Sequence, residues 1–172
     1  MARIDFTDLL SSMEATQEPA KYRRLKDNSI IPGLEVEVYV SESDSSDVYF
    51  APRSACELLG LNRNWLNTSY DRPSTMDRLS RFGFKAEKRM VNVMLENSAT
   101  RLSKPCIALD RQDFDALMEY AASVGKREAI ALRNAFMLLG LVGAAGLADN
   151  PAKTREAFLN IYNQCKVELE AE

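Results

Sequence analysis

The stretch VYFAPRSACELLGLNRNWLNTSY, residues Val48 to Tyr70, is typical of a strand end that leads into two helices joined by a tight turn. Pro52 suits the first helical position because its missing N–H has no intrahelical partner there. Gly60 suits the end of that first helix, where a left-handed conformation is favoured. Asn62 suits the cap of a second helix, expected over 62–70. The spacing therefore predicts a helix-turn-helix-like pair.

The two faces of the expected second helix differ in chemistry. Trp65 and Leu66 are apolar and are expected to face the core. The other face carries side chains of the types that pair with base edges or phosphates in a major groove: Arg63, Asn64, Asn67 and Thr68. Helix pairs joined by Leu-Gly also occur in domains that bind nothing, where such a face is only exposed surface. DNA recognition and a purely structural role are both open for this stretch.

The net charge of −3 hides an uneven distribution of basic residues. Between Ala51 and Lys104, ten lysine or arginine residues face five aspartate or glutamate residues, so this span carries +5 and the rest of the chain −8. A gathered positive charge is the electrostatic footprint expected of a nucleic-acid-binding protein. Phosphate contacts are expected from seven residues of this span: Arg53, Arg72, Arg78, Arg81, Lys85, Lys88 and Arg89.

The composition excludes several classes of function. The 172 residues contain no histidine, which removes histidine-containing catalytic triads, zinc sites and histidine-based nucleases. Three widely spaced cysteines argue against a disulfide framework or a zinc finger and favour reduced thiols. Neither a secretory signal nor an apolar run long enough to cross a bilayer is recognisable. We therefore expect a cytoplasmic protein without membrane contact, metal or other cofactor.

The distribution of apolar and charged residues along the chain predicts three parts. Residues 1–30 are expected to form an N-terminal arm, residues 31–148 one α+β domain, and residues 149–172 a final amphipathic helix. The arm ends in the basic cluster KYRRLK. Such clusters are usually solvated, and the functional alternative is that Arg23 and Arg24 reach phosphates beside the main site.

Hydrophobic periodicity indicates the elements of the middle part. Alternating apolar residues predict strands, which form a small antiparallel sheet, over 34–40, 48–50, 90–95 and 105–109. Apolar residues three and four apart predict further helices over 74–82, 110–125 and 127–141. Asp110, with Asp113 three residues later, suits the cap of the first helix of a C-terminal helical half.

A family resemblance follows from two segments, DVYFAPRSACELLGL and IALDRQDFDALMEYAASVGKREAIALRNAFM. Together they resemble the N-terminal domain of phage and viral antirepressors of the BRO type, and similar stand-alone proteins of cyanobacteria and their phages. The parallel positions are Tyr49, Phe50, Leu59 and Gly60, then Asp110, Phe114, Ala129 and Phe136. The resemblance implies DNA binding and a role in gene control of a phage or mobile element.

Three hypotheses follow. The leading one is a non-enzymatic transcription regulator or antirepressor that binds double-stranded DNA as a homodimer with two half-sites. The second is a protein-binding inhibitor of a host or phage regulator, which would use the acidic remainder and the apolar C-terminal helices. The third is a magnesium-dependent nuclease in which Glu35, Glu37 and Lys88 take part.

Overall fold

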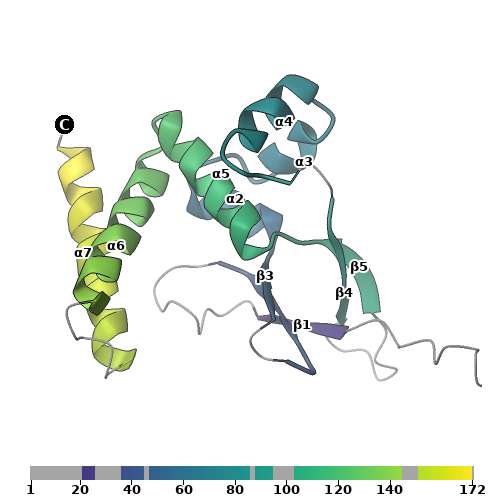
Figure 1. Ribbon diagram of the computed structural model, residues 1–172, viewed down its shortest axis with the longest axis horizontal. Helices are drawn as coiled ribbons and strands as arrows, with labels where there is room; N and C mark the ends of the chain where they lie inside the picture. Colours follow the sequence, from purple (N-terminus) through teal and green to yellow (C-terminus); the bar gives the residue numbers. More distant parts are fainter. Residues whose placement is uncertain are drawn as a thin grey trace, which may run out of the picture.

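The computed structural model describes residues 21–25, 36–44, 47–85, 88–94, 103–144 and 151–171. Within them the chain forms a five-stranded sheet and six helices, so the predicted α+β class with a helical C-terminal half is confirmed (Figure 1). The predicted N-terminal arm, apart from residues 21–25, and the first residues of the predicted strand 34–40 lie outside the described residues, as does Glu35.

The sheet is mixed. Its strands are β1 (Lys21–Leu25), β2 (Val38–Ser41), β3 (Val48–Phe50), β4 (Met90–Met94) and β5 (Ser103–Ile107). Their spatial order is β3-β2-β1-β4-β5, and neighbours are antiparallel except for β1 and β4, which are parallel. The predicted antiparallel arrangement is therefore wrong at one pairing, because the residues of β1 were predicted to belong to an N-terminal arm outside the sheet.

Strand β1 corrects the prediction of a solvated arm for the cluster KYRRL. It occupies the centre of the sheet, between β2 and β4. Tyr22 is 7% exposed, and its hydroxyl donates a hydrogen bond to Oδ2 of Asp47 across 2.7 Å. One buried aromatic ring and two ladders of backbone hydrogen bonds thus hold a segment whose composition is typical of exposed surface.

Six helices of the described residues follow β3 along the chain. They are α2 (Pro52–Leu58), α3 (Trp65–Ser69), α4 (Pro73–Ser80), α5 (Arg111–Ser123), α6 (Arg127–Ala144) and α7 (Pro151–Glu170). Pro52 begins α2 as predicted, and Gly60 follows it with a φ of 70°. The carboxylate of Asp110 caps α5 by accepting the Asp113 N–H across 2.8 Å, which confirms that cap.

The main core lies among the helices. Its most completely buried large side chains are Leu59, Leu66, Leu79, Leu109, Leu117 and Leu132. Phe50 at the end of β3 stacks on Phe114 of α5, with ring centroids 4.3 Å apart, and joins the sheet to this core. Helices α6 and α7 run side by side at the end of the molecule farthest from β4 and β5, where Phe136 packs on Phe158 (Figure 1).

One face of the sheet prepares the candidate site. The register places Tyr22 beside Val93 of β4, and Val93 beside Lys104 of β5. It also places Arg24 beside Tyr39 of β2. Because paired residues share a face and side chains alternate along a strand, Arg24, Tyr39 and Lys104 all lie on the face of Tyr22.

Candidate nucleic-acid interface

A hollow of about 330 Å³ lies where this face of the sheet meets helices α2 and α3. Basic side chains reach it from four elements: Arg24 of β1, Arg53 of α2, Arg63 before α3 and Lys104 of β5. Two carboxylates, Glu37 and Glu57, and the amide of Asn67 complete its polar wall. We call the space enclosed by these seven residues the basic hollow.

Backbone contacts hold the start of α2 against the start of β2. The N–H of Ala51 donates to the carbonyl oxygen of Glu37 across 2.9 Å. The N–H of Glu37 in turn donates to Oγ of Ser54, also across 2.9 Å. Pro52 has no N–H to satisfy, so the chain turns into α2 at this point without an unpaired donor from that residue. These contacts place Arg53 and Glu57 beside the sheet face.

Two of the four basic side chains have an acidic partner within the hollow. Arg24 Nε lies 2.5 Å from Oε1 of Glu37, and this pair is partly buried. Arg63 Nε lies 3.9 Å from Oε1 of Glu57, with both side chains more than half exposed at 61% and 54%. An exposed pair at that distance contributes little, so the charge of Arg63 remains available to a ligand.

The other two cations carry the positive potential of the hollow. Within the described part of the chain, neither Arg53 nor Lys104 forms an ion pair. Both are exposed. Four cations against two carboxylates leave the hollow with an excess of positive charge, concentrated at Arg53 and Lys104.

Asn67 occupies a position that the sequence did not predict. It was expected on an exposed base-reading face, but it is half-buried in the wall of the hollow. Among the described residues, its Oδ1 has no hydrogen-bond partner although that atom is shielded from solvent. A buried acceptor without a partner costs about 1–3 kcal/mol, so a donor that reaches this oxygen would recover that free energy.

Helix α3 is shorter than predicted. The expected helix spans 62–70, whereas the structure has five helical residues, Trp65–Ser69. The reason is local: Oδ1 of Asn62 accepts the N–H of Asn64 across 3.0 Å, which holds these residues in a turn. Arg63 and Asn64 therefore precede the helix. Asn64 and Thr68 are exposed, and Thr68 Oγ1 donates to the carbonyl oxygen of Trp65 across 2.9 Å.

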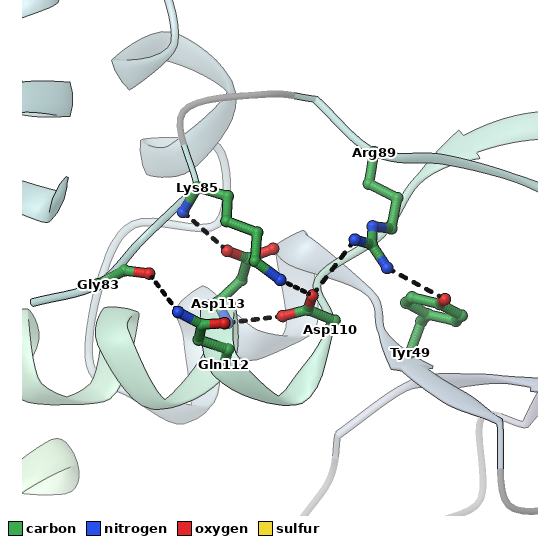
Figure 2. A network of polar contacts seen from close by, with 7 residues as sticks. All are labelled: Tyr49, Gly83, Lys85, Arg89, Asp110, Gln112 and Asp113. Atoms are coloured by element: carbon green, nitrogen blue, oxygen red, sulfur yellow. Dashed lines mark hydrogen bonds and ion pairs between the residues drawn. The ribbon is translucent and has the colours of Figure 1, made fainter.

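A second polar cluster lies at the N-terminus of α5 and involves two of the predicted phosphate contacts (Figure 2). Lys85 Nζ lies 2.6 Å from Oδ2 of Asp110, and a terminal nitrogen of Arg89 lies 3.4 Å from the same oxygen. The guanidinium of Arg89 also donates to the hydroxyl of Tyr49 across 3.2 Å. Asp110 thus draws both basic side chains toward the N-terminus of α5, a partnership the sequence did not reveal.

The pKa values of the two carboxylates in this cluster, Asp110 and Asp113, are shifted in opposite directions. Burial raises the pKa of Asp110, but the hydrogen bond from Lys85, the N–H of Asp113 and the charge of Arg89 together hold that pKa below its ordinary value. Burial is the largest influence on Asp113 and raises its pKa, with a further contribution from the charge of Asp110. Asp110 is consequently the ionised partner of the two cations.

Four predicted phosphate contacts remain, three of them on α4 or next to its ends. Lys88 Nζ lies 5.0 Å from the ring centroid of Tyr70, a cation–π contact. Arg72, Arg78 and Arg81 are exposed. The structure therefore separates the eleven predicted DNA-binding residues: Arg53, Arg63 and Asn67 line the basic hollow, and the others lie outside its lining.

Two residues of the hollow were not among the predicted binding residues. Arg24 was assigned to an arm, with phosphate contact as an alternative, and Lys104 to a polar loop. A usable signal was the basic excess that ends at Lys104, but the strand register that brings Lys104 to the hollow depends on pairing between distant segments. For the nuclease hypothesis, the described residues contain no group of three or more acidic or cysteine side chains placed to hold a metal ion.

Comparisons with known proteins add no identification, because neither family models, curated proteins nor solved structures give a match to the chain. In the described part of the chain, none of the helices combines the length and apolar character needed to cross a bilayer.

Proposed function

We propose that the protein is a DNA-binding regulator that contacts double-stranded DNA through the rim of the basic hollow and the exposed residues of α3 and α4. The observation that supports this most is the pair of exposed, unpaired cations within the described residues, Arg53 and Lys104, at the rim of one hollow. Phosphate groups are the ligands such cations favour, and their contacts set affinity and register on a duplex.

The exposed residues beside the hollow supply the remaining contacts. Arg63 and Asn64 lie in the turn before α3, and Thr68 lies on it, where they can meet base edges. Arg72, Arg78 and Arg81 extend the basic surface over α4. Gene control in a phage or mobile element, as the resemblance to BRO-type antirepressors implies, is the biological role we propose, and a homodimer is the assembly that would double this surface.

The test is a binding series with DNA fragments from the protein's own genomic neighbourhood, measured by fluorescence anisotropy at increasing salt. We expect affinity to fall steeply with salt, and Arg53→Ala and Lys104→Ala each to lower the slope by about one counterion. Arg127→Ala removes the same kind of exposed charge from the start of α6 and serves as the matched control. Affinity that is absent, or insensitive to salt, would refute the proposal.

A second candidate function is supported by a different surface. An open groove of about 810 Å³, mostly apolar, is lined by strand β3 and helices α5 and α6, with Val36 before β2 and Leu58 of α2. Its lining includes Phe50, Phe114 and Phe136, and Met137 beside them is 64% exposed. Exposed apolar surface of this kind is typical of protein-binding sites. If the protein binds a regulator through this groove, a pull-down with the wild type recovers a stoichiometric protein partner. Met137→Glu is then expected to lose this partner, and Arg53→Ala to keep it.

A further inference from the structure

The inner wall of the basic hollow contains acceptors that a DNA backbone does not need. Glu37, Glu57 and Asn67 line the hollow together with the cations, and the amide oxygen of Asn67 is a buried acceptor. A phosphodiester offers only acceptors, so it satisfies Arg53 and Lys104 but leaves Asn67 Oδ1 without a donor. The wall is therefore suited to a ligand that carries both an anionic group and a hydrogen-bond donor.

The dimensions of the hollow favour a small molecule over a duplex edge. Its volume of about 330 Å³ is at the lower end of the range for small-ligand sites. Asn67 lies in its wall with Oδ1 shielded from bulk solvent, so the edge of a base pair held in a duplex does not reach this oxygen. The terminal torsion of asparagine is soft, and a rotation of the amide turns the oxygen toward a ligand inside the hollow.

We propose that the basic hollow binds a free nucleoside monophosphate whose base carries an exocyclic amino group, and that this ligand competes with DNA. Its phosphate pairs with Arg53 and Lys104, the two cations at the rim. Its amino group donates to Oδ1 of Asn67 at the wall. The competition rests on the proposed DNA binding, because both ligands use Arg53. Binding of the nucleotide by itself does not rest on DNA binding.

A neighbouring group is compatible with a phosphate. Tyr39 lies in the floor of the hollow, and burial, followed by the nearby Cys106 and Glu37, raises the pKa of its hydroxyl to about 12. Tyr39 is therefore neutral at physiological pH and adds no negative charge. Arg24 compensates the charge of Glu37 across 2.5 Å, so the repulsion that remains comes chiefly from exposed Glu57, which Arg63 also faces.

Isothermal titration calorimetry of the full chain with AMP and with IMP tests the ligand class, because the two share the ribose phosphate and IMP carries a carbonyl oxygen where AMP carries the amino group, its base donor being the ring N1–H instead. We expect AMP to bind about tenfold more tightly than IMP, as the loss of one hydrogen bond to a buried acceptor predicts. GMP and CMP are expected to follow AMP, and UMP to follow IMP. Inorganic phosphate is expected to bind more weakly than any of them.

Two variants locate the contacts. Asn67→Leu keeps a similar volume and removes an acceptor that no described group satisfies, so we expect it to fold and to bind AMP and IMP alike. Arg53→Ala is expected to weaken every nucleotide, and Arg127→Ala none. Thermal unfolding of each variant verifies the fold. Asn67→Asp is measured if Asn67→Leu is too unstable. It retains an acceptor oxygen and is expected to keep the preference for AMP.

The outcomes separate the two proposals. Absent binding of AMP, equal binding of IMP, binding no tighter than that of inorganic phosphate, or an AMP preference that survives Asn67→Leu would each overturn the nucleotide site. AMP binding with no DNA binding leaves this site standing and removes the proposed regulator. Where both ligands bind, saturating AMP is expected to lower DNA affinity several-fold, and unchanged affinity would overturn the competition.

Discussion

The backbone N–H of Lys85 donates a hydrogen bond to Oδ1 of Asp113 across 3.0 Å, although 28 residues separate the two in sequence. Asp113 is 2% exposed and lies in the first turn of α5. Its carboxylate therefore anchors the segment after α4 to the start of the C-terminal helical half. The Gln112 side chain adds a parallel contact, donating to the carbonyl oxygen of Gly83 across 3.1 Å (Figure 2).

Replacing Asp113 tests this anchor. We expect Asp113→Ala to lower the free energy of unfolding by about 2 kcal/mol, because it removes the buried acceptor of the Lys85 N–H. Asp115→Ala, at an exposed position of the same helix, is the control and is expected to change stability by less than about 0.5 kcal/mol. Urea unfolding at neutral pH measures both. Equal effects of the two substitutions would show that Asp113 does not anchor the segment.

The pH dependence of stability reports on Asp110. Its pKa in the folded protein lies below the ordinary value of 3.8, so the ionised carboxylate stabilises the fold above pH 3.8, and this contribution is lost as the pH falls through the lowered pKa. Asp110→Asn keeps an oxygen for the helix cap but loses the charge opposite Lys85 and Arg89. We expect the stability difference between wild type and variant to be largest near neutral pH and to shrink below pH 3.8. A difference that does not change with pH would contradict this.

Two glycines provide opposite expectations for the same substitution. Gly60 has a φ of 70°, and a Cβ there would also contact the carboxylate of Glu128. Gly60→Ala is expected to destabilise the fold by about 1 kcal/mol or more. Gly140 lies exposed in α6, and among the described residues nothing lies within 4 Å of a Cβ added there, so Gly140→Ala is expected to stabilise by about 0.5–1 kcal/mol. Thermal unfolding of both variants measures these changes in stability. A stabilising Gly60→Ala would be inconsistent with a strained turn at Gly60.

The three thiols are expected to differ in reactivity. Cys56 is fully buried, and burial raises the pKa of its thiol to about 11, so almost no thiolate exists at pH 8. Cys106 and Cys165 are partly exposed. A disulfide reagent at pH 8 should therefore modify these two in the native protein and Cys56 only after unfolding, as peptide mass spectrometry can show. Rapid labelling of Cys56 in the native state would contradict its burial in the core.

Local sequence signals were sufficient to predict most of the helices and the N-terminal cap of α5. The apolar spacing around Phe114 and the carboxylate of Asp110 predicted α5 and its cap, and both are confirmed. These signals succeed because a helix is held by contacts three or four residues apart, which a short stretch of sequence contains. The second helix of the pair was overestimated because the side chain of Asn62 stabilises a turn instead of capping a longer helix.

The strand β1 and the basic hollow were beyond the reach of local signals. Three basic residues among the five of β1 make its composition that of exposed surface, and its place in the sheet depends on pairing with β2 and β4, whose partner residues lie well over ten positions away in the chain. The same non-local pairing brings Arg24 and Lys104 to one face. Sequence predicted a basic excess around the helix pair, but not which of its charges would face one another.

The sequence by itself determined the α+β class, the position of the helices, the helix pair after Phe50 and the absence of histidine chemistry, because each is a property of composition or of short-range periodicity. Tertiary structure alone decided that Lys85 and Arg89 lie against Asp110, and that Arg53 and Lys104 meet at one hollow with Asn67 in its wall. The physical reason is that electrostatic pairing and burial depend on distance in space, which strand register and helix packing set between residues remote in sequence.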